Sequence, residues 1–543
     1  MWRDMRTESG RWREMLPPVG TLHARRWMVV LGIAGATAVS SPLSAQYPSV
    51  PPPQPCRARE SLQLRTAMVH AVSDPSGNAI GVVSFQNTAA KRVDDFLGDA
   101  ITRRIVDRLR ATGMLDVAET RKFGVEQYKT VAGIETVGSW LHARYLVLGR
   151  VGRTGGNISI AVRLVDAKSG TELWKLSRLS SESDLPAVEA AVVNGVLANI
   201  GFAAKDTPAA AVAGARANAA SYDHFLRGAY YHAQATPAGF RQAVAEYDSA
   251  VRLDSAYAPA ATRLGLAYVS ELYWGWWDFQ EPRRQALIAR GLAAVDLSLR
   301  LDSAQADAWA ARGALLSYLD PRSFMGVREA FDRASKLGSR MPDVYQWYGR
   351  IMMERGDNQT ARLMLRRALD LAPRRASVLF DLAHLDYLQR NFADACAVLD
   401  SAVESDPLAA QPYALRALVR ARRDDIRGAW ADAETASRLG WPEWGDAISA
   451  VVDARARDTT SARVRTKRLL HAYAARGTNP VHWAGPWIAV ALASSGQESK
   501  ALDFLEQAGS PGAPLWSALQ MPDFAPITRS PRFERLQRLS RPQ

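Results

Sequence analysis

A 34-residue period is the feature of this sequence that most limits the folds open to it. Each copy has a small residue, a large apolar residue four positions later, a small residue three positions after that, and a helix stop five further on. The stops fall at positions 339, 373, 407 and 441. A fixed period of this length indicates a row of stacked helical units, each too small to bury its apolar face alone.

The spacing predicts close contacts between neighbouring helices. In the first helix of a unit, Tyr345 precedes Gly349 and Trp309 precedes Gly313 by four positions, so a small residue lies where the next helix must approach. A 34-residue unit of two antiparallel helices is typical of the tetratricopeptide repeat. The second-helix copies are Val327, Phe331, Ala334 and Ser339; Ala361, Leu365, Ala368 and Pro373; Ala395, Leu399, Ala402 and Pro407; and Ala429, Ala433, Ala436 and Trp441.

A mixed pattern of strands and helix precedes the repeats, over residues 78–202. Five apolar runs are predicted strands, and residues 92–113 form a predicted amphipathic helix that ends at Gly113. The glycines of "LGRVGRTGG" fit either a hairpin turn or a phosphate loop, and the hairpin is favoured because no Walker motif or following helix is present. The predicted strands are 78–86, 114–119, 143–153, 157–166 and 171–178.

These patterns predict a multidomain protein: a small α/β domain followed by an all-α tetratricopeptide repeat solenoid. The α/β domain occupies 78–202, and an alanine-rich linker is expected at 203–220. The solenoid is expected over 221–442. Degenerate repeats or capping helices are expected over 443–543, because terminal repeats of a solenoid are usually atypical.

The amino-terminal segment has the pattern of a secretory signal peptide. Arg25 and Arg26 precede an apolar run over 27–39, and small residues follow. The run is shorter than the ~20 residues that a membrane-spanning helix needs. We therefore expect a signal peptide at 1–45, a proline-rich linker at 46–77, and export, most simply to the periplasm. The alternative is an inner-membrane anchor formed by 27–39.

The chain has only two cysteines, Cys56 and Cys396. Two cysteines so far apart in a chain of this length do not suggest a disulfide framework. Cys396 lies in a predicted second helix, where a small buried side chain is the simplest interpretation. We therefore predict a fold without a supporting disulfide.

Three motifs, in order, resemble those of one bacterial family over residues 79–543. The front stretch, from "IGVVSFQNT" to "DAKSGTELW", looks like the TolB-amino-terminal-like domain that precedes tetratricopeptide repeats in many bacterial proteins. Asp166, Gly170 and Trp174 match that domain's closing motif, whereas Ser84 replaces its usual proline. "SYDHFLRGAYYHAQ" is similar to the start of the family's first repeat, and "MPDFAPITRSPRFERLQRL" to its tail.

The resemblance implies an interaction module without its usual effector. Relatives of this type carry a kinase, a nucleotide cyclase or a winged helix at the amino end. Residues 1–78 are too short for a kinase, and the chain has no His-Arg-Asp or Asp-Phe-Gly motif. We predict no enzymatic activity, no catalytic residues, no cofactor and no metal. His224 and His232 are eight residues apart, and packing or solvent exposure is preferred to a metal site because no third ligand is evident.

The resemblance also predicts a binding groove lined by the first helices of the repeats. The candidate side chains combine a cation, aromatic rings and hydrogen-bonding groups, which suit an extended peptide or an acidic chain end. The groove could instead be empty or filled by the chain's own termini. The groove candidates are Gln346, Arg350, Met353, Phe380, His384 and Tyr387.

An aromatic cluster interrupts the repeat spacing between the stops at Ser255 and Ser303. Two interpretations are open: a platform for a peptide or sugar chain, or a loop that folds back and buries itself. The cluster consists of Tyr273, Trp274, Trp276, Trp277 and Phe279.

Three functions follow from these observations. The leading hypothesis is a non-enzymatic exported scaffold that binds a protein or peptide. The alternative is a sensor whose α/β domain takes a small ligand. The third is a cytosolic or membrane-anchored protein resembling a transcription regulator. The formal charge of +13 favours acidic partners only weakly, and no nucleic-acid partner or membrane span of the mature chain is expected.

Overall fold

A computed structural model gives the fold of the second of two compact units, residues 52–543; the first is residues 1–51. The predicted leader and most of both predicted linkers lie outside the described residues. No helix among the described residues has the length and apolar character to cross a membrane. The described residues are 56, 77–88, 94–118, 128–155, 157–202, 218–234, 236–275, 281–319, 324–339, 341–439, 442–475, 485–507 and 513–541.

The front domain is built on one mixed sheet, with strand order β3-β1-β4-β5-β6 and β2 paired to β4. The short strands β1, β2 and β3 run parallel to their neighbours, and β4, β5 and β6 form an antiparallel meander. The hairpin expected in the glycine-rich stretch is confirmed, because Thr154 pairs with Asn157 at the β4–β5 turn. The strands are β1 (Ala79–Val82), β2 (Gln86–Asn87), β3 (Asp116–Val117), β4 (Tyr145–Thr154), β5 (Asn157–Asp166) and β6 (Glu172–Ser181).

Helices cover both faces of this sheet. The predicted helix is α2 (Phe96–Thr112), and its expected apolar stripe is buried. It packs with α4 (Leu185–Asn199) in one apolar core, whereas α3 (Val131–Leu141) packs with Leu146 and Leu148 of β4 in a second core. The helices α3 and α4 were not predicted from the sequence. The buried stripe consists of Phe96, Ile101, Ile105 and Leu109.

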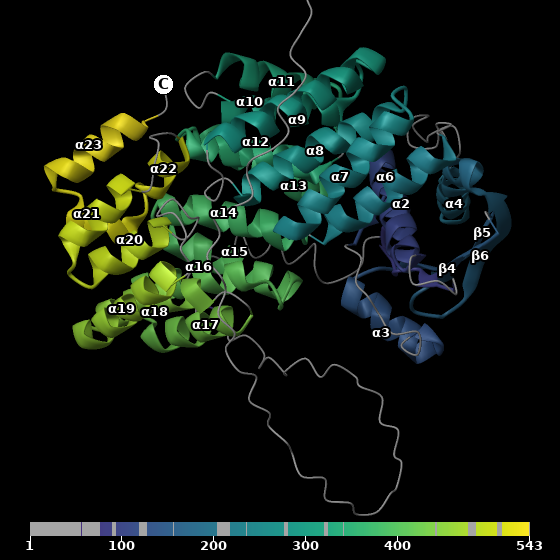
Figure 1. The fold of residues 1–543 in the computed structure, drawn as a ribbon. Coiled ribbons are helices and arrows are strands. Elements are labelled where there is room, and N and C mark those ends of the chain that lie inside the picture. Colours follow the sequence, from purple (N-terminus) through teal and green to yellow (C-terminus); the bar gives the residue numbers. More distant parts are fainter. Residues whose placement is uncertain are drawn as a thin grey trace, which may run out of the picture. The chain divides into compact units, whose positions relative to one another are not determined.

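Eight helical hairpins follow within the described part of the chain (Figure 1). The helices α12, α14 and α16 begin at Pro342, Ala376 and Ala410, which are 34 residues apart, as the period predicted. The hairpins are α6 (Ala219–Ala233) with α7 (Pro237–Leu253), α8 (Ala258–Gly275) with α9 (Glu281–Leu301), α10 (Ala306–Leu319) with α11 (Met325–Lys336), α12 (Pro342–Glu354) with α13 (Asn358–Leu371), α14 (Ala376–Leu388) with α15 (Phe392–Ser405), α16 (Ala410–Arg422) with α17 (Ile426–Arg438), α18 (Pro442–Arg455) with α19 (Thr459–Ala475), and α20 (Gly485–Ser494) with α21 (Glu498–Gln507).

The repeat register is confirmed by burial. All twelve small and large apolar positions of the four second-helix copies are at most 2% exposed. A Cβ atom on Gly349 would lie 2.8 Å from the Leu365 side chain, and one on Gly313 would lie 2.7 Å from the Phe331 ring. Glycine is therefore required where the first helix meets the second. These buried positions form the apolar core that stacks the hairpins.

A buried charge cluster joins the α/β domain to the first hairpin. Glu189 of α4 is fully buried and accepts a hydrogen bond from Arg108 of α2 at 3.0 Å. The Arg104 guanidinium lies 3.5 Å from the same carboxylate, and the Tyr222 hydroxyl of α6 donates to it. Burial alone would lower the pKa of Arg104, but Glu189, together with Tyr222, Tyr257 and Asp107, outweighs it, so this pKa is raised well above its usual range.

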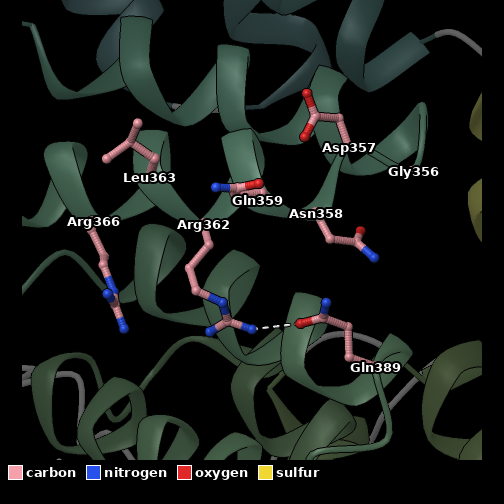
Figure 2. A pocket seen from close by; sticks show the side chains of 8 residues that line it. All are labelled: Gly356, Asp357, Asn358, Gln359, Arg362, Leu363, Arg366 and Gln389. Atoms are coloured by element: carbon pink, nitrogen blue, oxygen red, sulfur yellow. Dashed lines mark hydrogen bonds between the residues drawn. The ribbon is translucent and has the colours of Figure 1, made fainter.

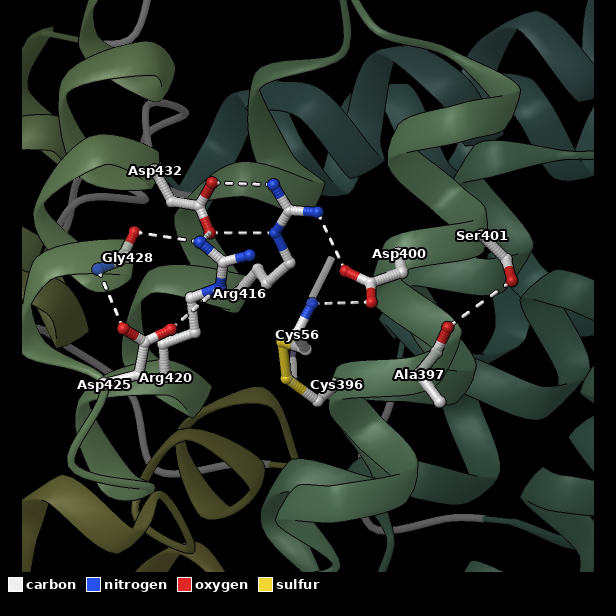
Figure 3. The surroundings of a disulfide bond; sticks show 10 residues. All are labelled: Cys56, Cys396, Ala397, Asp400, Ser401, Arg416, Arg420, Asp425, Gly428 and Asp432. Atoms are coloured by element: carbon white, nitrogen blue, oxygen red, sulfur yellow. Dashed lines mark hydrogen bonds and ion pairs between the residues drawn. A yellow bond between two sulfur atoms is a disulfide. The ribbon is translucent and has the colours of Figure 1, made fainter. Parts of the chain in front are cut away.

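A disulfide joins Cys56, which precedes the α/β domain in the sequence, to Cys396 of α15 (Figure 3). The prediction of a fold without a disulfide is therefore wrong, although Cys396 is buried as expected. The backbone N–H of Cys56 donates to Asp400 at 2.8 Å, and Arg416 donates to the other oxygen of Asp400 at 2.9 Å. Arg416 also forms a bidentate pair with Asp432. Pairing of distant cysteines depends on tertiary proximity, which the spacing along the chain does not reveal.

Candidate functional site

The candidate site is a cluster of charged and aromatic side chains on the first helices of successive hairpins. Arg350 of α12 lies at its centre. Its guanidinium carbon is 4.1 Å from the centre of the Tyr273 ring of α8, and its Nε is 3.7 Å from the Asp381 carboxylate of α14. A cation placed over an aromatic ring beside a carboxylate is held by both interactions. Tyr273 and Arg350, predicted as members of separate sites, therefore belong to one cluster, which we call the Arg350 cluster.

Hydrogen bonds fix the carboxylate that faces Arg350. Gln346 Nε2 donates to Asp381 at 2.6 Å, and Ser377 Oγ donates to Gln346 at 3.3 Å. Asp381 is 1% exposed, and burial raises its pKa despite the opposing effect of Arg350. Nearby His384 is also desolvated, which lowers its pKa to about 4 and keeps its imidazole neutral at pH 7. The cluster thus presents fixed charges with little water around them.

Glu354 adds a second carboxylate one turn after Arg350 on α12. Burial raises its pKa to about 7, with Asp381 adding to the rise and Arg350 opposing it. Tyr318 of α10 and Tyr273 of α8 also interact with this carboxylate, and burial raises the pKa of both phenols. Arg350 is therefore shared between the carboxylates of Asp381 and Glu354, both of which are largely removed from solvent. Glu354 was not predicted from the sequence, although its i,i+4 spacing from Arg350 was a usable signal.

Replacing Glu354 with glutamine is expected to make the protein more stable above neutral pH. A carboxyl whose pKa rises on folding stabilises the protein when protonated, and that contribution is lost as pH rises from about 4.5 to about 7. The Glu354→Gln variant lacks this loss, so it should exceed the parent by on the order of 1 kcal/mol at about pH 8 and match it at about pH 4. Melting temperatures across this range measure the difference.

His384 also makes the stability of the protein depend on pH, but with the opposite sign. Comparing the variant with the parent protein separates the contribution of Glu354 from that of His384. Because the pKa of His384 is lowered to about 4, its contribution to stability is lost as pH falls below about 6.5. That loss is common to both proteins and cancels in the difference. A difference between the two proteins that does not change with pH would contradict the placement of Glu354.

The six predicted groove residues differ in how far the fold exposes them. Arg350, Phe380 and His384 are partly exposed, whereas Gln346 is 7% and Met353 is 5% exposed. Tyr387 is completely buried. Phe380 and His384 lie on one face of α14 with their ring centres 6.0 Å apart. The most accessible candidates are therefore Arg350, Phe380 and His384, and their role in binding stays a prediction.

The carboxyl-terminal segment covers Tyr387. Asp523 of η5 (Pro522–Ile527) is 2% exposed, and the Tyr387 hydroxyl donates to its carboxylate. Arg422 of α16 donates to the same carboxylate at 2.6 and 3.1 Å. Phe524 and Phe533 follow in the tail and are fully buried. Near Tyr387, the carboxyl-terminal segment thus covers the helix face that was expected to be open. A groove filled by the chain's own termini was the alternative expectation.

The aromatic cluster predicted before α9 is only partly described. Tyr273 takes part in the Arg350 cluster, and Trp274 lies in the last turn of α8. Trp276, Trp277 and Phe279 lie outside the described residues. Neither interpretation of the aromatic cluster is decided by these positions, but Tyr273 places its beginning beside the candidate site.

The two histidines considered as metal ligands have separate partners. His224 contacts Glu246 at 2.6 Å, whereas His232 contacts Ser270 at 2.9 Å and packs against the Phe240 ring. Burial lowers the pKa of His232 to about 4. Among the described residues, no group of three or more His, Cys, Asp or Glu side chains could hold a metal ion.

A shallow pocket of about 690 Å³ lies beside α13, away from the predicted residues (Figure 2). Arg362 crosses it and donates to Gln389 and to Asp386, both at 2.6 Å. Asp357 is used as the amino-terminal cap of α13. Since its main polar groups are engaged within the fold, this pocket is a weaker candidate. Its lining residues are Gly356, Asp357, Asn358, Gln359, Arg362, Leu363, Arg366 and Gln389.

Comparison with protein families identifies the repeats. A family model described as "Tetratricopeptide repeat" matches residues 329–419, which run from α11 to α16. This part of the chain consists of tetratricopeptide repeats, as the 34-residue period predicted. No curated protein matches the chain. Repeats of this kind typically mediate interactions between proteins.

Comparison with solved structures finds proteins of low sequence identity that are similar to parts of this chain. YrrB, described as a TPR protein with an unusual peptide-binding site, is 17% identical, with 36% of this chain and 92% of YrrB covered and a TM-score of 0.27. PilF of Pseudomonas aeruginosa is 18% identical, with 40% and 93% covered and a TM-score of 0.33. Yeast Tom70 is 15% identical, with 58% and 66% covered and a TM-score of 0.38.

Proposed function

We propose that this protein is a non-enzymatic, exported scaffold that binds a protein or peptide partner through the first helices of its repeats. The observation that carries the proposal is the Arg350 cluster, which spans α8, α10, α12 and α14. Arginine and aromatic side chains that lie together and partly exposed on one face are the residue types that dominate many protein interfaces. The fold class agrees, since repeat solenoids generally act as interaction surfaces rather than as enzymes.

Export is supported by the disulfide. Cystine bonds persist in oxidising compartments and are rare in the bacterial cytosol. The bond between Cys56 and Cys396 therefore agrees with the signal-peptide pattern of 1–45. We further propose that the front domain is of the TolB-amino-terminal type and that the protein is bacterial, on the sequence motifs that include Asp166 and Trp174.

Two motif residues have clear structural roles that fit this proposal. Asp166 accepts hydrogen bonds from the backbone and hydroxyl of Ser169 and so shapes the β5–β6 turn, where Gly170 has φ +69°. Trp174 packs so closely on Gly195 of α4 that a Cβ there would lie 2.0 Å from the ring. These positions are needed to join the last strand to α4.

Replacing Arg350 and Phe380 with alanine together is expected to weaken partner capture at least about tenfold while leaving the protein folded. Both side chains are partly exposed on the first-helix face. Phe380 also packs against the apolar core and Arg350 pairs with Asp381, so circular dichroism must first show that the variant is folded. Tyr387 is a poor choice for this test because its loss would disturb the buried Asp523. Crosslinking in the native envelope, followed by pull-down and quantitative mass spectrometry, measures the change.

The matched control replaces Arg367 and Leu363 with alanine. Both lie on the second helix α13, and Leu363 is 61% exposed. The control should retain every partner that the parent protein captures. Retention of the same partners by the Arg350 and Phe380 variant, at the same yield, would show that the groove assignment is wrong.

The sensor alternative is favoured by one observation, the contact between the two domains. Arg153 of β4 pairs with Asp94 at 2.7 Å and with Asp223 of α6, while Arg263 of α8 donates to Asp107 of α2 at 2.8 Å. A change in the α/β domain would therefore reach the first two hairpins directly. The sensor hypothesis ranks second because this contact by itself points to no ligand.

A further inference from the structure

A second pocket, of about 530 Å³, lies between the second helices α7 and α9 and over α8. Its size is within the range of ligand-binding sites. The α7 side chains that line it recur every three or four residues, as do those of α9, so each helix contributes one continuous face. The lining residues are Arg241, Val244, Ala245, Asp248, Ser249 and Arg252 of α7, Tyr268 and Glu271 of α8, and Arg283, Ala286, Leu287 and Arg290 of α9.

The floor of this pocket is largely apolar. Tyr268 is 1% exposed and Leu287 is 9% exposed, and Val244 is partly buried beside them. Glu271 is the polar group of the floor, at 5% exposure. Burial raises its pKa, and the Arg283 guanidinium at 3.5 Å opposes that rise. An apolar floor favours a ligand that brings an apolar side chain of its own.

Arginines form the rim, and they outnumber the carboxylates. Four arginines and two carboxylates line the pocket, which leaves an excess of two positive charges (4 − 2). Arg252 pairs with Asp248, and Arg283 lies closest to Glu271. Arg241 and Arg290 have no ion pair or hydrogen bond with any described residue. They are exposed, they line the pocket from different helices, and both act electrostatically on Glu271.

We propose that this pocket binds an acidic segment of a partner protein, with carboxylates paired to Arg241 and Arg290 and an apolar side chain on the floor. Guanidinium groups pair with carboxylates in a bidentate geometry, which gives the site chemical selectivity. The carboxylates of Asp248 and Glu271 disfavour a dense polyanion such as nucleic acid, because each repels closely spaced phosphates. The acidic residues of the partner must therefore be far enough apart to reach the two arginines without lying beside Asp248 or Glu271.

This site would make the scaffold bivalent. The pocket is lined mainly by second helices, whereas the Arg350 cluster belongs to first helices. If the Arg350 cluster binds a partner as proposed above, a second partner at this pocket would place two molecules on one solenoid. Such an arrangement raises the local concentration of each partner near the other.

The test uses the full-length mature protein and a short fluorescein-labelled peptide of alternating glutamate and leucine. Fluorescence anisotropy should show saturable binding that weakens with added salt. Replacing Arg241 and Arg290 with glutamate should weaken binding at least about tenfold. Lysine at both positions should give an intermediate affinity, because lysine keeps the charge but loses the bidentate geometry.

The matched control replaces Arg300 of α9 and Arg333 of α11 with glutamate, since both are exposed and lie outside the pocket. Circular dichroism checks that both variants are folded. Equal losses in the two variants would mean that net charge alone is responsible, and the proposal would be wrong. Equal binding of the glutamine version of the peptide, or tighter binding of single-stranded DNA than of the acidic peptide, would also overturn it.

Discussion

Replacing Cys56 with serine and Cys396 with alanine is expected to lower the free energy of unfolding by about 2–5 kcal/mol. The two cysteines are 340 residues apart, so the bond restricts the unfolded chain over a very long loop. The variant also removes the covalent link between Cys56 and α15, where the backbone N–H of Cys56 donates to Asp400. Urea unfolding, followed by circular dichroism with and without a reductant, measures the change.

The reductant itself supplies the control. It should destabilise the parent protein by a similar amount and leave the double variant unchanged. In intact cells, rapid trapping with a thiol-alkylating reagent should find both cysteines oxidised if the protein is exported. If the double variant were as stable as the parent protein, or if the processed protein had free thiols, the disulfide would not have the stabilising role proposed for it.

Replacing Glu189 with glutamine is expected to cost about 3–5 kcal/mol. The Glu189 carboxylate neutralises the buried guanidinium groups of Arg104 and Arg108 and accepts a hydrogen bond from the Tyr222 hydroxyl. Glutamine keeps the shape of the side chain but removes the negative charge that both cations share. Because the cluster joins α2, α4 and α6, hydrogen exchange should increase in all three helices, while chemical denaturation reports the total loss.

The comparison for Glu189 is Glu172→Gln on β6. Glu172 is exposed and pairs only with the exposed Lys175 at 3.3 Å, so its replacement should change stability by less than about 1 kcal/mol. If Glu189→Gln behaved like this control, or if exchange increased only in α4, the cluster would not hold the two domains together.

The repeats could be predicted because their core is periodic. Residues such as Leu365 and Leu399 contact the next helix at the same point of every unit, so one spacing rule describes many contacts. The helices α3 and α4 escaped prediction for a different reason. The sequence of α4 is apolar almost all round, without the polar face that marks a surface helix, and it is buried between the sheet and the first hairpin.

The candidate site could be predicted only in outline. The register placed Arg350 and Phe380 on the first-helix face, but it could not show that Tyr273, 77 residues earlier, stacks on the same guanidinium. Nor could it show that Asp523 closes over Tyr387, because the tail follows no repeat rule. Contacts between distant segments depend on how the hairpins stack, which a local pattern does not encode.

The Cys56–Cys396 bond also has a consequence for a molecule whose backbone is cut. The bond closes a covalent loop that contains the α/β domain and the first four hairpins. A single cleavage anywhere in that loop leaves the two fragments joined until a reductant is added. Nicked and intact molecules can therefore be told apart by electrophoresis under reducing conditions, but not without a reductant.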